Sequence, residues 1–299
     1  MGHDGMLPPV LGTVLTAIVT PFDASGAVDE KAFRHLCHHL LREGSDGIVV
    51  AGTTGEASTL TDDERLDLIR ITVDECSEAG TVVAGTGSND TAHSVHLTEA
   101  AKEMGVDAVL AVTPYYNRPP AQGIVQHVSA IAEVGVPVVL YNIPGRTGVN
   151  MPPELIVELA AIPGVMALKQ ANPDLAEARA VLETTDLALY AGNDDMYLPV
   201  LEMGGAGVIS VASHLVGDRM QKMAELVRSG DIDDARGIDD DISPLYTGLF
   251  ETTNPILIKA ALQMVGLIPD DTLRLPLVRA TEDERQALSA VLADVGVTA

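Results

Sequence analysis

Short apolar segments recur along this chain and alternate with stretches of helical periodicity. The segments are rich in Val, Ile and Leu, and they are continuous rather than alternately apolar and polar. That pattern is typical of strands in a parallel sheet whose two faces are both buried. The predicted strands are residues 14–19, 47–50, 82–84, 108–112, 136–140, 165–168, 187–190 and 208–211.

Two of the intervening segments carry clear helix boundaries. Thr61 is followed three residues later by Glu64, which matches a capping box and predicts a helix that begins there. Another helix is predicted to begin near Asp90 or Thr91 and to end at Gly105, because glycine readily takes the left-handed conformation of a helix C-terminus. The helices therefore fall between the strands, as a βα alternation requires.

Eight strands that alternate with helices indicate an α/β fold of the (β/α)8 TIM-barrel type. Beyond about residue 229 the chain shows no strand-like run of comparable quality, and three helices are predicted, over 232–250, 255–265 and 282–293. We therefore expect a barrel catalytic domain over 1–228 and a C-terminal helical extension over 229–299. A doubly wound open sheet is the alternative fold.

Composition excludes several classes of function. A formal net charge of −25 argues against binding to nucleic acids or anionic membranes, because there is no excess of Lys and Arg to meet phosphates. The two cysteines give no disulfide framework and no Cys-rich zinc motif, and the eight histidines show no metal-ligand spacing. No apolar stretch reaches the roughly 18 residues of a membrane span, and no signal peptide is evident. We expect a cytoplasmic protein.

Lys169 is the leading candidate for chemistry. It follows the apolar run 165–168, where a buried strand ends. Burial disfavours an ammonium ion, so a lysine in such a place can supply a free amine that attacks a ketone and forms a Schiff base. A lysine whose charged end reaches solvent at the end of a strand is the structural alternative. The residues at the other strand ends favour the chemical interpretation.

Active sites of (β/α)8 barrels lie at the C-terminal ends of the strands. After strand 2, the turn 52–56 holds Thr53 and Thr54, whose hydroxyls and backbone N–H groups could bind a carboxylate. The same four-residue pattern also occurs in simple tight turns, which is the structural alternative. Strand 5 ends at Tyr141, and Arg146 follows between two glycines, where it could bind a carboxylate or simply lie on the surface.

Further candidates follow strands 4, 7 and 8. Tyr115 and Tyr116 are two of only six tyrosines, and they fall at the same predicted barrel mouth unless they are core aromatics. Gly192 follows strand 7, and Ile209 lies in strand 8. Together these turns offer a lysine, phenols, hydroxyls and one guanidinium around a single opening.

These motifs resemble those of the dihydrodipicolinate synthase family, within the pyruvate-dependent class I aldolases that also include N-acetylneuraminate lyase. Gly-Thr-Thr-Gly-Glu occurs across that superfamily, whereas Tyr-Tyr-Asn-Arg-Pro and Tyr-Asn-Ile-Pro-Gly-Arg-Thr-Gly are more specific to the synthase branch. The matching segments run nearly end to end: 17–22, 52–56, 113–119, 141–148, Lys169, 204–211, 254–256 and 273–276.

The resemblance implies a reaction that condenses pyruvate with L-aspartate-4-semialdehyde, in lysine and diaminopimelate biosynthesis, without a metal or organic cofactor. Lys169 would form the Schiff base with pyruvate. Thr53 and Thr54 would hold the pyruvate carboxylate. Tyr141, Thr53 and Tyr116 would form a proton relay, with Tyr116 linking the site to solvent.

The resemblance also implies roles around this centre. Arg146 would bind the carboxylate of the semialdehyde, while Gly192 and Ile209 would line the pocket with backbone carbonyls. Tyr115 would belong to a tight dimer contact, with a tyrosine of the pair reaching the neighbouring subunit's site. A dimer or a homotetramer is therefore expected, and the sequence does not decide between them.

Three positions depart from the pattern of many synthases. Gln170 and Asn172 stand where Glu-Ala-Thr is common, and Asn193 stands where Gly-Asp-Asp is common. Because both places are expected near the site, they bear on the second substrate more than on Lys169. Another Schiff-base enzyme, a 2-keto-3-deoxy sugar-acid aldolase or dehydratase or a sialic-acid lyase, is the alternative, and a non-catalytic pyruvate-binding barrel is a second.

The feedback site of lysine-inhibited members also differs. Their histidine and glutamate correspond here to Asp62 or Arg65 and to His93, while Asn89 and Tyr115 are retained. His93 supplies no carboxylate for the ammonium of lysine, and Arg65 would repel it. We expect weak or absent inhibition by lysine.

Overall fold

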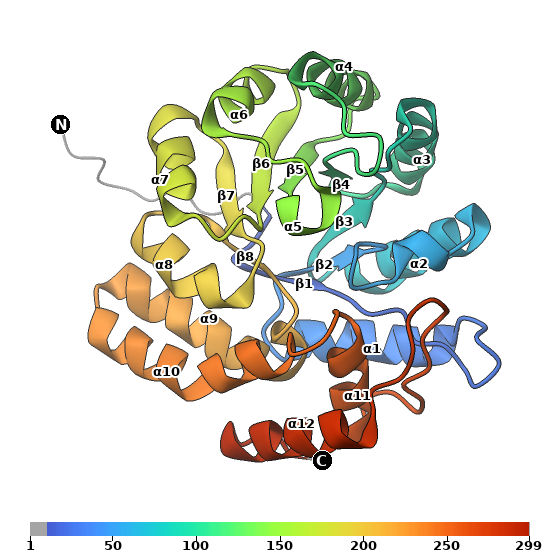
Figure 1. Ribbon diagram of the computed structural model, residues 1–299, viewed down its shortest axis with the longest axis vertical. Coiled ribbons are helices and arrows are strands. Elements are labelled where there is room, and N and C mark those ends of the chain that lie inside the picture. Colours follow the sequence, from blue (N-terminus) through green and yellow to red (C-terminus); the bar gives the residue numbers. More distant parts are fainter. Residues whose placement is uncertain (1–10, 299) are drawn as a thin grey trace.

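The computed structural model describes residues 11–298, and they form a closed barrel of eight parallel strands surrounded by helices (Figure 1). Strands β1 to β8 pair in sequence order, and Leu15 of β1 lies opposite Ile209 of β8, which closes the sheet. The TIM-barrel prediction is confirmed and the open-sheet alternative is wrong. The strands are β1 (Val14–Ala17), β2 (Gly47–Val50), β3 (Thr81–Gly85), β4 (Ala108–Val112), β5 (Val138–Asn142), β6 (Val165–Gln170), β7 (Ala188–Ala191) and β8 (Gly207–Ser210).

The fifth strand begins two residues later than predicted, and it carries Tyr141 inside the strand rather than at its end. Pro137 explains the difference, because proline has no N–H to donate to a sheet; its carbonyl still accepts a bond from Val109 N at 2.8 Å. β6 likewise continues past Lys169 to Gln170. Beyond a register shift between Val138 and Val139, Tyr141 and Lys169 lie directly opposite each other in the β5–β6 pair.

Helices cover the outside of the barrel. The capping box at Thr61 is present in both directions, and Asp90 caps the next helix, which ends at Gly105 with a φ of 85°. Both predicted helix starts are therefore confirmed. The barrel helices are α1 (Glu30–Arg42), α2 (Asp62–Cys76), α3 (Thr91–Met104), α4 (Ala121–Ala132), α5 (Pro144–Thr147), α6 (Pro153–Ala160), α7 (Leu175–Thr184), α8 (Tyr197–Glu202) and α9 (Ser213–Ser229), with short 3₁₀ turns η1 (Ala57–Thr59) and η2 (Asp194–Met196).

Three further helices follow the barrel: α10 (Ile232–Gly248), α11 (Ile256–Met264) and α12 (Glu282–Asp294). They gather on one side of the barrel, beside α1 and α9 (Figure 1). Leu245, Ile258 and Leu288 belong to the same apolar core as Phe33 of α1. The helical C-terminal region is thus present as predicted, and its packing is continuous with the barrel; the division at 228/229 stays a prediction.

A buried ion pair fastens this C-terminal region to the turn after β2. The side chain of Lys259, on α11, is fully buried, and its Nζ lies 2.8 Å from Glu56 Oε1. The same ammonium donates to Thr20 O at 2.8 Å and lies 4.3 Å from the centroid of the Phe22 ring. Burial lowers the pKa of Lys259, and the Glu56 carboxylate opposes that change. The second Glu56 oxygen accepts from Arg274 N at 3.1 Å.

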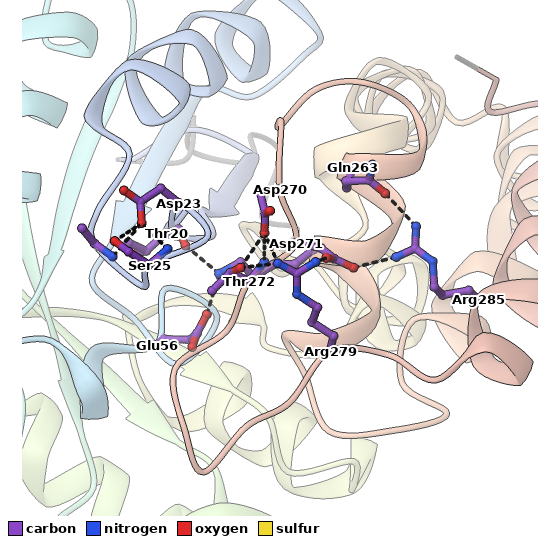
Figure 2. A network of polar contacts seen from close by, with 12 residues as sticks. Thr20, Asp23, Ser25, Glu56, Gln263, Asp270, Asp271, Thr272, Arg279 and Arg285 are labelled. Atoms are coloured by element: carbon purple, nitrogen blue, oxygen red, sulfur yellow. Dashed lines mark hydrogen bonds and ion pairs between the residues drawn. The ribbon is translucent and has the colours of Figure 1, made fainter.

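A second set of contacts extends this junction toward α12. Figure 2 shows Thr20 and Glu56 on the barrel side, facing the segment that carries Asp270 and Asp271. Arg279 Nη1 pairs with Asp271 at 3.0 Å, and Arg285 Nη1 pairs with the same carboxylate at 2.6 Å. The loop between α11 and α12 is therefore held by charge on both of its sides.

The buried pair predicts a large loss of stability when one partner is removed. Changing Lys259→Met leaves the Glu56 carboxylate buried without its counter-charge, which costs about 3–5 kcal/mol. We expect a marked fall in the thermal unfolding midpoint, measured by calorimetry.

The matched control is Lys222→Met, because Lys222 forms an exposed pair with Glu225 at 3.1 Å. Exposed pairs contribute about 1 kcal/mol or less. Similar small shifts in both variants would show that the buried pair does not hold the junction.

Candidate active site

Lys169 and Tyr141 form the centre of the site. Both side chains project into the barrel interior, and both are buried. Lys169 Nζ lies 4.4 Å from the centroid of the Tyr141 ring. Among residues 11–298, Lys169 forms no ion pair, in contrast to Lys259. A buried amine without a carboxylate partner is free to act on a ligand.

A cavity of about 290 Å³ opens at the C-terminal ends of the strands. Tyr141 lines it, together with Thr53, Tyr115 and Arg146, so four of the predicted site residues meet at one opening. Lys169 is not one of the lining residues; its amine lies against the Tyr141 ring. The remaining walls come from the turn after β2 with η1 and Arg65 of α2, from the end of β3, from β4, from Ile143 and Thr147, and from the C-terminal segments at 253–254 and 276–277.

The turn after β2 presents its two threonines differently. Thr53 is half-buried and lines the cavity, whereas Thr54 is buried and its Oγ1 accepts a hydrogen bond from Asn254 Nδ2 at 2.9 Å. Ala51 and Glu56 both have a φ of 54°, in the left-handed region. The backbone of this turn therefore takes a rarely populated conformation. Contacts from the C-terminal region, made by Asn254 and by Lys259 in its ion pair, hold it there.

Asn254 joins this turn to Arg146. Its carbonyl oxygen accepts from Arg146 Nη2 at 3.1 Å, while its side-chain amide donates to Thr54. The sequence analysis used residues 254–256 only as evidence of resemblance and gave Asn254 no role. Its place directly before a proline at the start of a predicted helix gave no signal of a contact with the turn after β2, about 200 residues earlier.

The two neighbouring tyrosines point to different surroundings. Tyr115 lines the cavity, whereas the side chain of Tyr116 is 90 % exposed and its φ is 69°. A tyrosine in the left-handed region is rare. Within this single chain, Tyr116 does not join the cavity that Tyr141 and Thr53 share.

Gly192, just after β7, and Ile209, in β8, do not line this cavity. A Cβ at Gly192 would come within 2.6 Å of Ala171 Cβ, so close packing requires glycine there. Ile209 is fully buried and belongs to the interior cluster with Tyr141 and Tyr190. The expected roles of their carbonyls stay predictions.

Gln170 lies on the other side of its strand from Lys169. Its Oε1 accepts from Asn142 Nδ2 at 2.9 Å, and the same amide donates to Asn150 Oδ1. Asn172 also bonds to Asn150, at 3.2 Å, and to Glu177. These departures from the synthase pattern therefore form a polar network between the sheet and the outer helices. Neither Gln170 nor Asn172 lines the cavity, so no contact supports the expectation that they bear on the second substrate.

Asn193 lies in a different hollow, with Asp195 and Tyr246, and donates to Met196 Sδ at 3.7 Å. Its neighbour Asp194 is buried and accepts from Ser210 Oγ at 2.5 Å and from Ala212 N at 3.0 Å.

Burial raises the pKa of Asp194; those hydrogen bonds and the charge of Lys169 oppose the change. Asp194 thus orders the end of β8 close to the lysine. The sequence analysis missed this role because an aspartate in a polar turn gives no sign of burial.

In the part of the chain that the structure describes, no group of three or more His, Cys, Asp or Glu side chains is arranged to hold a metal ion. No helix in the same part is both long enough and apolar enough to cross a membrane. The groups at the site are an amine, phenols, hydroxyls and a guanidinium, which suit acid–base and nucleophilic chemistry on a carbonyl compound.

Comparisons with known proteins match this chain to one family of synthases over nearly its full length. A family model described as the dihydrodipicolinate synthetase family matches residues 10–295. The chain is 44% identical over 289 residues to the 4-hydroxy-tetrahydrodipicolinate synthase of Moorella thermoacetica, covering 96% of this chain and 99% of that one. It is 46% identical over 288 residues to the enzyme of the same name from Bacillus subtilis, covering 95% and 99%.

Solved structures agree with the fold. The synthase of Cyanidioschyzon merolae, whose structure is described as having lysine bound, superimposes with a TM-score of 0.93 at 42% identity, covering 96% of this chain and 98% of that one. The chloride-inhibited synthase of Acinetobacter baumannii, complexed with pyruvate, gives a TM-score of 0.93 at 37% identity, covering 96% and 99%. With its barrel, its Lys169–Tyr141 centre and these full-length matches, the chain belongs to the dihydrodipicolinate synthetase family.

Proposed function

We propose that this protein is a 4-hydroxy-tetrahydrodipicolinate synthase, which condenses pyruvate with L-aspartate-4-semialdehyde through a Schiff base on Lys169. The observation that carries the proposal is the position of Lys169, buried against Tyr141 and without an ion-pair partner among the described residues. The curated relatives share the synthase name at 42–47% identity, which favours this activity over the sugar-acid aldolase and sialic-acid lyase alternatives.

The amine of Lys169 attacks the ketone carbon of pyruvate, and loss of water gives the imine. The imine withdraws electrons from the methyl group, which loses a proton and becomes an enamine. The enamine carbon then forms a bond to the aldehyde carbon of the semialdehyde. The amine of that substrate displaces Lys169, which closes the ring and releases free enzyme. The ring of Tyr141 lies beside the amine, which supports a role for its phenol in exchanging these protons.

The two substrate carboxylates are assigned to different residues around the cavity. Thr54 Oγ1 accepts a hydrogen bond from Asn254, so its own hydrogen stays available for the pyruvate carboxylate. Thr53 supports the same group and continues the relay from Tyr141. Arg146, which Asn254 orients through its carbonyl, binds the carboxylate of the semialdehyde. Gly192 and Ile209 present backbone carbonyls to the bound intermediate.

Assembly is part of this proposal. Tyr116 is 90 % exposed and held at a φ of 69°, which suits a side chain that enters a neighbouring subunit's site. Tyr115 then lies at the contact between the two subunits, in a dimer or in a tetramer of two dimers. The barrel domain over 1–228, the extension over 229–299, the cytoplasmic location and the weak or absent inhibition by lysine stay predictions.

Turnover of pyruvate and L-aspartate-4-semialdehyde is expected to depend on Lys169. The assay couples the product to its reductase and follows NADPH oxidation, with Lys169→Ala beside the native chain. Because the covalent step requires the amine, the variant should lose at least about 10³-fold in kcat/KM. Borohydride reduction with pyruvate should add a stable mass at Lys169, detected by peptide mass spectrometry.

The two readouts separate the possible failures. Trapping at Lys169 without turnover would keep the imine and exclude this second substrate, leaving an aldolase of another keto acid. Failure to trap pyruvate at Lys169 would refute the whole Schiff-base mechanism.

The Tyr116→Phe variant should slow turnover while leaving pyruvate binding largely intact, because it removes one hydroxyl of the relay and keeps the aromatic ring. A fall of about 10²-fold or more in kcat, with little change in the pyruvate KM, is the expected result. Steady-state kinetics at varied pyruvate measure both quantities. Full activity in this variant would exclude Tyr116 from the relay.

A further inference from the structure

Three carboxylates are buried in the part of the chain that the structure describes: Glu56, Asp194 and Asp271. Glu56 pairs with Lys259 at 2.8 Å. Asp271 pairs with Arg285 at 2.6 Å. In the same part of the chain, Asp194 has no Lys, Arg or His nitrogen within 4.0 Å. A buried carboxylate without a cation is unfavourable, so Asp194 needs a different explanation from the other two.

The hydrogen bonds of Asp194 favour its charged form. Ser210 Oγ donates to Oδ1 at 2.5 Å, and Ala212 N donates to Oδ2 at 3.0 Å. Val211 N lies 3.3 Å from both oxygens. Burial raises the pKa of Asp194, whereas these hydrogen bonds and the charge of Lys169 oppose that change. An ionised carboxylate can only accept hydrogen bonds, so three donors around it suit the anion.

Asp194 and Lys169 lie at the same end of the barrel. Lys169 is opposite Tyr190 in the β6–β7 pair, and Asp194 begins η2, three residues after β7 ends at Ala191. The carboxylate bonds to Ser210, the last residue of β8. The charge of Lys169 acts on Asp194 although the two form no ion pair within 4.0 Å. The two unpaired charges are therefore placed to compensate each other at a distance.

The Schiff base of the proposed function changes the charge on the Lys169 nitrogen. When the adduct of the free amine and the ketone loses water, it takes up one proton and becomes a protonated imine with a positive nitrogen. When the methyl group then loses a proton, the electron pair moves toward that nitrogen, which becomes neutral in the enamine. A fixed negative charge nearby stabilises the protonated imine relative to the neutral states, and the effect is strong in the protein interior.

We propose that Asp194 is the counter-charge of the protonated imine on Lys169, a positioning residue that acts through its charge without touching the substrate. Ser210 and the backbone amides hold the carboxylate charged and out of contact with the amine. Lys169 is thereby stabilised as a cation without being fixed in an ion pair, as Lys259 is. The inference rests on the proposed function, because it requires the Schiff base.

Other titratable groups surround the two charges. They include Tyr141 of β5, Tyr190 of β7, Asp195 of η2, Asp239 and Tyr246 of α10, and Glu251. Burial raises the pKa of Tyr190 to about 12, and burial also raises the pKa of Tyr246, so both phenols stay neutral near pH 7. Burial and the charge of Asp240 raise the pKa of Asp239 to about 6, so this carboxyl group titrates close to neutral pH. Asp239 therefore needs a control of its own.

The test compares Asp194→Asn with the native enzyme and measures reductive trapping of pyruvate at Lys169. Cyanoborohydride and subsaturating pyruvate are used from about pH 6 to about pH 9, and peptide mass spectrometry measures the adduct. At alkaline pH the free amine gains a charge when the imine forms, so Asp194→Asn should trap about tenfold less. At low pH the nitrogen is a cation before and after the reaction, so the variant should match the native enzyme.

The controls separate charge from structure. Asp195→Asn is the matched control, because Asp195 is the exposed next residue of the same turn, and Asp239→Asn removes the group that titrates near pH 6. Ser210→Ala removes one donor and keeps the charge of Asp194, so it should show no deficit that grows with pH. Asp194→Ser leaves room for water at the backbone amides and serves if Asp194→Asn does not fold.

Three outcomes would overturn the inference alone. A deficit of equal size at every pH would show that Asp194 only orders the end of β8, and undiminished trapping at alkaline pH would remove it from the chemistry. The same pH-dependent deficit in Asp195→Asn or Asp239→Asn would assign the effect to the acidity of the whole region. If the native enzyme itself fails to trap pyruvate at Lys169, the proposed function falls and this inference falls with it.

Discussion

The Glu56–Lys259 ion pair is the constraint on which the geometry of the site depends. It fixes the last residue of the turn that carries Thr53 and Thr54, and it does so from α11, outside the eight βα units. Asn254, just before that helix, reaches the same turn and Arg146. The C-terminal region is therefore part of the site's supporting structure, because it holds left-handed backbone that the barrel strands alone would not fix.

Lys169 and Lys259 show how neighbours decide the use of a buried lysine. Both are almost inaccessible to solvent, and both lie close to an aromatic ring. Lys259 meets a carboxylate at 2.8 Å and serves the fold, whereas Lys169 has no ion-pair partner among the described residues, lies against the ring of Tyr141 and is the proposed nucleophile. The buried carboxylate of Asp194, which feels the charge of Lys169, is held by Ser210 and two backbone amides instead. Burial disfavours the ammonium form of both lysines, and the neighbouring group determines whether the lysine forms an ion pair or stays available to a ligand.

The sequence predicted the order of strands, the barrel and the lysine, because continuous apolar runs and a capping box are local signals. It did not predict which residues meet across the barrel. The register of β5 against β6 shifts between Val138 and Val139, and in the shifted register Tyr141 lies opposite Lys169. The contacts of Asn254 and Lys259 with the turn after β2 join positions about 200 residues apart, and only tertiary structure creates them. Lys259 alone left a trace, as a charge inside the apolar run 256–262.

Neighbours in sequence on β6 face different parts of the protein. Gln170 departs from the synthase pattern next to Lys169 in the chain, yet it bonds to Asn142 in the layer behind the strand. Arg65 is more than 100 residues from Lys169 in sequence, yet it lines the same cavity as Tyr141. Successive side chains of a strand point to opposite faces of the sheet, so a residue next to Lys169 in sequence need not contact the substrate. The residues that a ligand in this cavity meets therefore lie in the cavity wall, which includes η1 and Arg65 of α2, rather than at the positions that follow the lysine.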